Sequence, residues 1–166
     1  MSGQIEEYRN KVKLPIKLSL SKQLLIDIDQ MPITQHDRAR AGEHVLDWLA
    51  CASLGKLSDA GRAYQGLLSL DEGGKCTALG GQQTSMQNAA QHNGALGNVL
   101  EMDDIHRRSI LHPGPVIIPA ALAAAEQINC SLETFLSAII KGYEVTIRMG
   151  EAIGRSHYRY FHNTAT

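Results

Sequence analysis

Five side chains that can bind or release a proton lie close together in the middle of this sequence. They are the carboxylates Glu101, Asp103 and Asp104 and the imidazoles His106 and His112. Neighbouring carboxylates raise one another's pKa, and an imidazole titrates near neutrality. These groups are therefore suited to moving a proton at pH 7. They occupy a predicted helix end that continues into a Pro/Gly loop, a place where functional groups often concentrate.

The same cluster fits two other interpretations. It could be the solvated end of a helix, or it could bind a metal ion through Asp103, Asp104, His106 and His112. The spacing of these residues matches no standard metal-ligand pattern. We therefore predict that the site contains no metal, and we keep metal-dependent hydrolysis only as an alternative.

Other polar groups carry weaker signals. His162 lies among aromatic and hydroxyl side chains near the C-terminus, which alone indicates only a surface tail. Glu144 and Arg148 are one helical turn apart and are predicted to form a structural ion pair. The Gly80-Gly81 pair lacks the motif and the preceding strand of a phosphate-binding loop. No role is assigned to the remaining candidates, His36, His44 and His92.

Helical periodicity dominates the chain, and strand signals are nearly absent. Residues 1–18 are expected to form an irregular arm. Residues 19–166 are expected to form one all-α, multi-helix bundle. Caps and breakers predict helices over 21–30, 34–55, 58–70, 85–102, 116–128 and 131–153. Segments 75–83 and 103–115 are predicted to be loops, and the tail after Gly154 has no helical pattern.

Apolar spacing predicts how these helices pack. One stripe runs along the second helix and another along the last, and the segment 116–128 is apolar on nearly every face, as in a buried central helix. Gly94 and Gly97 indicate close contact between helices. The two stripes consist of Ala41, Val45, Trp48, Leu49 and Ala52, and of Phe135, Ile139, Tyr143 and Ile147.

Composition excludes several classes of protein. The 16 basic and 17 acidic residues are balanced and scattered, and aromatic residues make up 5%, which argues against nucleic-acid binding and membrane binding. Cys51, Cys76 and Cys130 show no disulfide or zinc spacing. The longest apolar run, 116–125, is too short to span a bilayer, and the N-terminus lacks a secretory signal. We therefore expect a cytoplasmic protein with reduced thiols.

Several segments, in this order and spacing, resemble the MmgE/PrpD family, the 2-methylcitrate dehydratase-like enzymes. The resemblance covers most of the chain after residue 20. The segments are HVLDWLACASLG (44–55), CTALGGQQTSMQNAAQHNGALGNVLEMDDIHR (76–107), ILHPGPVIIPAALAAAEQI (110–128), AIIKGYEV (138–145) and FHNTAT (161–166).

The resemblance implies a helical domain with a separate α/β lid. It also implies a lyase- or isomerase-like enzyme, dehydratase- or decarboxylase-like, that transfers a proton without a cofactor beside a carboxylate of a small di- or tricarboxylic acid, in a homodimer. His112 would act as acid or base, and Glu101 or Asp104 would orient or polarise. His162 would bind a carboxylate or share the proton transfer. Asp103 and His106 are expected to contact the substrate.

The sequence departs from the family pattern in three positions and in length. Asp and Thr stand at positions 101 and 105 of the decarboxylase-like pattern, where this chain has Glu101 and Ile105, which argues against decarboxylation here. Asn98 stands where many relatives carry His. Family members are much longer, so we expect an N-terminal fragment of the helical domain, inactive alone and self-associating. The alternative is a catalytically silent helical remnant or oligomerisation module.

Overall fold

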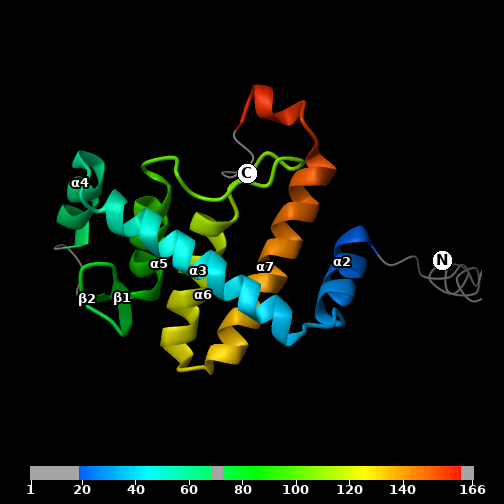
Figure 1. Cartoon of the computed structure of the whole chain (residues 1–166), viewed down its shortest axis with the longest axis horizontal. Helices are drawn as coiled ribbons and strands as arrows, with labels where there is room; N and C mark the ends of the chain where they lie inside the picture. Colours follow the sequence, from blue (N-terminus) through cyan, green and yellow to red (C-terminus); the bar gives the residue numbers. More distant parts are fainter. Residues whose placement is uncertain (1–18, 69–72, 162–166) are drawn as a thin grey trace, which may run out of the picture. The chain divides into compact units, whose positions relative to one another are not determined.

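The chain folds into α-helices and one small antiparallel sheet (Figure 1). The computed structural model describes residues 19–68 and 73–161. Within these ranges the helical fold predicted from the sequence is confirmed. The predicted arm, residues 1–18, and the candidate residue His162 lie outside the described residues. None of the helices in the described ranges has the length and apolar character needed to cross a membrane.

Six α-helices, two strands and a 3₁₀ turn make up the described part. The bounds are α2 (Leu20–Asp29), α3 (Gln35–Gly55), α4 (Asp59–Leu68), β1 (Cys76–Ala78), β2 (Gln82–Thr84), α5 (Met86–Asn98), α6 (Gly114–Ile128), α7 (Leu132–Ile153) and η1 (His157–Arg159).

Helix α2 belongs to a first compact unit, residues 1–31, and all other elements belong to a second, residues 32–166. The N-cap of α2 is Ser19, whose hydroxyl accepts a hydrogen bond from the Lys22 N–H at 3.3 Å. The predicted cap, Ser21, instead lies inside the first turn. Both serines can cap, and the choice between neighbouring candidates depends on where the chain first turns.

Helix α3 begins where its capping signal predicted. Thr34 and Asp37 form a capping box, in which the Thr34 N–H donates to the Asp37 carboxylate at 2.8 Å. Trp48 and Ala52 of the predicted stripe are buried, whereas Leu49 is 38% exposed, so that position was predicted wrongly. The predicted apolar stripe on α3 is wider than the face of the helix that packs against the core.

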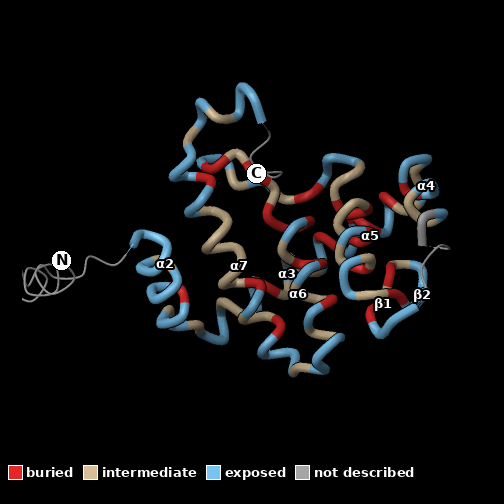
Figure 2. The backbone as a smooth tube through the Cα atoms, turned by 180° about the vertical axis from the view of Figure 1, so that it is seen from behind, coloured by how far each residue is buried: buried red, intermediate tan, exposed pale blue. Residues whose placement is uncertain are grey.

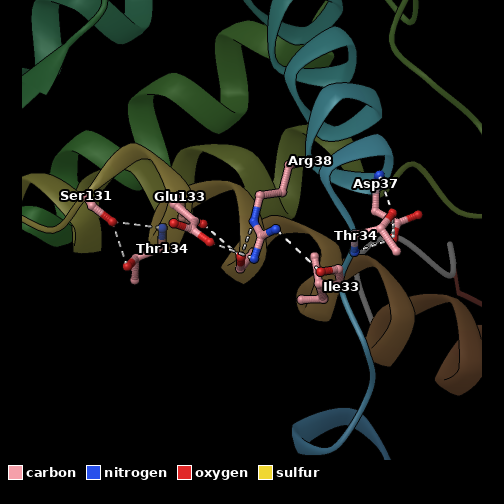
Figure 3. Close-up of polar contacts among 8 residues, drawn as sticks. Ile33, Thr34, Asp37, Arg38, Ser131, Glu133 and Thr134 are labelled. Atoms are coloured by element: carbon pink, nitrogen blue, oxygen red, sulfur yellow. Dashed lines mark hydrogen bonds and ion pairs between the residues drawn. The ribbon is translucent and has the colours of Figure 1, made fainter.

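Arg38 connects the N-terminal ends of α3 and α7 (Figure 3). Its guanidinium donates to the Ser137 hydroxyl at 3.2 Å, forms an ion pair with Glu133 at 2.9 Å, and reaches the Ile33 carbonyl at 3.4 Å. Ser131 caps α7 by accepting from the Thr134 N–H at 3.1 Å, as predicted. The two helix ends are thus fixed to each other by polar contacts at the edge of the core.

The core of the second unit lies between α3, α5, α6 and α7 (Figure 2). Glycines in α5 permit the close helix contacts predicted for them: a Cβ at Gly97 would lie 2.6 Å from the Trp48 ring nitrogen, and one at Gly94 would lie 2.8 Å from the Pro115 carbonyl oxygen. Helix α6 is less enclosed than predicted, because Val116 is 41% exposed. Its buried residues lie mainly toward α5 and α7.

Residues 75–83 were predicted to be a loop, and this prediction was wrong, because the segment contains most of a β-hairpin. Strands β1 and β2 pair in the register Cys76 with Thr84 and Ala78 with Gln82. Asn93 of α5 holds β1: its Oδ1 accepts from the Leu79 N–H at 2.8 Å, and its Nδ2 donates to the Thr77 carbonyl at 2.8 Å. Each strand is three residues long and depends on this tertiary contact, so the sequence shows no alternation of apolar and polar residues from which the strands could be predicted.

Candidate functional site

The candidate site lies on the loop between α5 and α6. Helix α5 ends at Asn98, four residues before the predicted end. Glu101 then adopts a left-handed backbone conformation with φ of 52°, which turns the chain away from the helix axis. The helix therefore ends before Met102, and the chain continues as a loop in which Asp103 is buried.

Asp103 and His112 face each other across this loop. The His112 Nδ1 lies 3.0 Å from the Asp103 Oδ2, and the two side chains are 11% and 1% exposed. The distance is that of an ion pair. Asn98 Nδ2 also donates to both Asp103 oxygens at 3.3 Å. The buried carboxylate thus fixes the imidazole against the end of α5.

Asp104, the next residue, points to a different set of partners. Its Oδ1 accepts the Gly114 N–H at 2.9 Å, and its Oδ2 accepts the Tyr143 hydroxyl at 2.9 Å. His44 Nδ1 lies 3.5 Å from the same Oδ2. A Cβ at position 114 would lie 2.6 Å from Asp104 Oδ1, so this contact requires glycine. One carboxylate thereby connects α3, α6 and α7.

Tyr143 and His44 share the environment of Asp104. Their rings lie 5.3 Å apart between centroids at a 47° tilt. Burial raises the pKa of the Tyr143 phenol far above its ordinary value, and the adjacent Asp104 charge and its hydrogen bond raise the pKa further. Tyr143 therefore stays protonated and donates its hydrogen bond to Asp104 throughout the physiological pH range.

A hollow of about 220 Å³ opens beside these two rings, between α3 and α7. Ile139 and Ile147 give it an apolar side, and Arg40 and Glu144 lie on its lining with His44 and Tyr143. The Glu144 carboxylate forms the predicted ion pair with Arg148 at 3.0 Å. The hollow therefore combines an apolar side with polar groups that contact Asp104 directly.

The structure describes two further candidate residues, His106 and Glu101. His106 Nδ1 contacts the Ser109 hydroxyl at 2.8 Å, and the His106 backbone bridges to Leu111. The Glu101 side chain is exposed and makes no ion pair or hydrogen bond within the part of the chain that the structure describes. Of the predicted cluster, the structure brings together Asp103 and His112, with Asp104 holding the same loop.

Residues 19–68 and 73–161 contain no group of three His, Cys, Asp or Glu side chains arranged to hold a metal ion. The chemistry available from the described groups is proton exchange at His112. Imidazole–carboxylate pairs serve as acid–base groups in many enzymes. The His112 side chain is 11% exposed, so part of it is accessible to solvent.

Sequence analysis did not identify His44, Tyr143 or Asn98 as neighbours of the site. Tyr143 was assigned to a packing stripe, and His44 received no role. Both contacts depend on how α3 and α7 pack against the loop, which local spacing does not specify. The only signal for Tyr143 was its place in the segment AIIKGYEV (138–145), one of those that carried the resemblance.

A helical domain whose interhelical loop carries a buried Asp–His pair defines this protein as a candidate acid–base enzyme domain. Residues 26–166 match the MmgE/PrpD N-terminal domain, and the chain belongs to that family.

Two curated relatives are similar to the chain. It is 33% identical over 122 residues to the cis-aconitate decarboxylase of Aspergillus terreus and 31% identical over 124 residues to the cis-aconitate decarboxylase-like protein oryM of Aspergillus oryzae. Each match covers 69% of this chain and 25% or 26% of the relative. The chain thus spans about a quarter of the length of the relatives it matches.

Proposed function

We propose that this chain contributes part of the active site of a lyase that moves a proton beside a carboxylate of a small di- or tricarboxylic acid. The observation that carries the proposal is the His112 ring held 3.0 Å from the buried Asp103 carboxylate. The family membership and the names of the two relatives support it independently. We propose that the reaction uses no metal or organic cofactor, in a cytoplasmic enzyme.

In this mechanism His112 is the acid or base that exchanges the proton, and Asp103 orients its ring. Asp104 keeps the loop in place through Gly114 and polarises the site. Asp103 at 1% exposure is too enclosed to contact a substrate, so we reassign it from substrate binding to orientation. Glu101, His106 and His162 remain proposed contacts for the substrate or its proton.

Residues 101 and 105 bear on which reaction the enzyme catalyses. The relatives' names favour decarboxylation, whereas Glu101 and Ile105 differ from the decarboxylase-like pattern. Ile105 is 54% exposed and offers no hydroxyl. We therefore propose dehydration or another proton transfer beside a carboxylate ahead of decarboxylation.

We expect no turnover of cis-aconitate or 2-methylcitrate by the 166-residue chain alone, because a site built from one side lacks the charges that stabilise the transition state. A chimera tests the proposed role of His112. Residues 26–166 would replace the matching segment of the Aspergillus terreus decarboxylase, and both acids would be assayed. His112→Gln should lower turnover by about 10²–10⁴-fold.

His36→Gln is the matched control, because His36 is exposed in the first turn of α3 and its substitution should leave turnover unchanged. An active chimera that tolerates His112→Gln would disprove the proposed role. If the chimera does not fold, perturbation of the His112 ring signals by cis-aconitate can be measured by NMR on the 166-residue chain. Ring signals that do not respond to the acid would count equally against the proposal.

A second candidate function is that of a catalytically silent helical module that associates with itself. Exposed leucines along α3 favour it, because an apolar face of this kind usually finds a partner. Sedimentation at micromolar concentration tests it, and a monomer would exclude it. The leucines are Leu46, Leu49 and Leu54 of α3 and Leu57 just after it, with exposures of 67%, 38%, 48% and 68%.

A further inference from the structure

The loop that carries the candidate site is closed by two neighbouring carboxylates. Asp103 Oδ2 lies 3.0 Å from His112 Nδ1, and Asp104 Oδ1 accepts the Gly114 N–H at 2.9 Å. Pro113, whose ring fixes its φ angle, lies between His112 and Gly114. The two contacts therefore share a short, stiff stretch of backbone, and a shift of Asp104 is transmitted to His112.

Tyr143 of α7 holds the other oxygen of Asp104. Its hydroxyl donates to Asp104 Oδ2 at 2.9 Å, whereas His44 Nδ1 lies 3.5 Å from the same oxygen, beyond the usual range of a hydrogen bond. The phenol keeps its proton, because burial raises the pKa of Tyr143 well above its ordinary value. Of these two neighbours, Tyr143 is therefore the one that fixes the carboxylate.

The Tyr143 hydroxyl is itself held in a fixed place. Its ring packs against the core cluster that includes Ile139, which is one helical turn earlier on α7 and only 1% exposed. A Cβ at Gly114 would lie 3.2 Å from the Tyr143 oxygen and 2.6 Å from Asp104 Oδ1, so both oxygens reach the same point of the loop. We call the contacts of Asp104 with Gly114 and Tyr143 the carboxylate clamp.

We propose that Tyr143 is a positioning residue for the proton exchange at His112 and that it acts through Asp104. The inference rests on the proposed function, in which His112 exchanges the proton, and it gives a role to a residue that sequence analysis assigned only to a packing stripe. By holding Asp104 against Gly114, the hydroxyl keeps the ends of the loop at one spacing and the His112 ring beside Asp103. Its removal should therefore slow the chemical step without weakening substrate binding.

Tyr143→Phe tests this role, because it removes one oxygen and keeps the ring that packs against the core. In the ¹⁵N-labelled 166-residue chain we expect shifted His112 ring signals and about fivefold faster hydrogen exchange of the Gly114 amide, the effect of losing one hydrogen bond. Tyr64→Phe is the matched control, since it removes a hydroxyl from a half-buried tyrosine of α4 and should leave both signals unchanged. Unchanged His112 signals in Tyr143→Phe would overturn the inference.

The chimera with the Aspergillus terreus decarboxylase separates a positioning role from a loss of stability. Tyr143→Phe should lower kcat about tenfold or more and leave KM within about twofold, since a misplaced acid–base group affects the transition state alone. Added to His112→Gln, it should lower turnover no further, because it acts only through that ring. A further loss in the double variant would indicate a general structural effect and would contradict the inference.

The outcomes also distinguish this inference from the proposed function. If His112→Gln lowers turnover and Tyr143→Phe does not, Tyr143 has no positioning role and the proposed function stands. If His112→Gln leaves turnover unchanged, the proposed function fails, and the inference fails with it. If the chimera does not fold, the NMR comparison on the 166-residue chain decides the inference.

Discussion

Two non-helical segments flank α5, and different side chains hold them in place. The β1–β2 hairpin is fixed by the neutral Asn93 amide, which pairs with backbone groups at 2.8 Å on both sides, and by the Glu126 carboxylate, which accepts the Thr77 N–H at 2.7 Å. The α5–α6 loop is fixed by the carboxylates of Asp103 and Asp104, whose partners include the titratable side chains of His112 and Tyr143. The hairpin thus takes two of its contacts from an amide that does not titrate, whereas the loop is held by carboxylates that face other titratable side chains.

The largest expected effect comes from removing the neutral clamp. Asn93→Ala leaves the half-buried Leu79 N–H and Thr77 carbonyl without their partner, which should cost about 2–4 kcal/mol of unfolding free energy. Urea denaturation measures this loss. Gln91→Ala, on the exposed side of α5, should change stability by less than about 0.5 kcal/mol. If both variants lowered the free energy of unfolding equally, Asn93 would have no special role in holding the hairpin.

Breaking the carboxylate clamp should cost less. Asp104→Ala removes the acceptor of the Gly114 N–H and the Tyr143 hydroxyl, but the Asp104 side chain is 17% exposed and water can replace part of it. We expect a loss of about 1–2 kcal/mol. Faster hydrogen exchange of the Gly114 amide should accompany it. The exposed Asp59→Ala is the control, and an unchanged Gly114 exchange rate would contradict the clamp.

The third expected effect is a change in how the free energy of unfolding depends on pH. Burial lowers the pKa of His92 below its ordinary 6.5, so the unfolded chain binds a proton more readily than the folded one. The stability contributed by neutral His92 is therefore present above pH 6.5 and lost as pH falls through and below it. Denaturation at pH 7.5 and 5.5 should show a smaller pH dependence for His92→Leu than for the unmodified chain. Identical dependence would mean that His92 is not responsible.

The local part of the fold could be predicted from sequence, and the tertiary part could not. Thr34, Ser85 and Ser131 cap their helices as predicted, because an N-cap depends only on its own first turn. The end of α5 was predicted too late, since apolar residues continue past Asn98 while Glu101 turns the backbone. The hairpin depends on Asn93, which no local pattern reveals.

For the candidate site, too, the local features could be predicted from the sequence and the tertiary contacts could not. Clustering of acids and histidines marked the α5–α6 loop as the candidate site, because its residues are close in sequence. It did not indicate that Asp103 rather than Glu101 faces His112, since that pairing follows from the turn at Glu101. Nor could it reveal the partners that Asp104 finds on α3 and α7, which lie far away in the chain.

The connections of Asp104 also bear on the order of folding. Tyr143 is 39 residues beyond it, and His44 lies in the first long helix, so both contacts enclose long stretches of chain. Closing such long loops is entropically costly and becomes favourable only after the helices have packed. We therefore expect the clamp to form after the folding transition state. Stopped-flow kinetics of Asp104→Ala should show faster unfolding with a nearly unchanged folding rate, so that the site matures last.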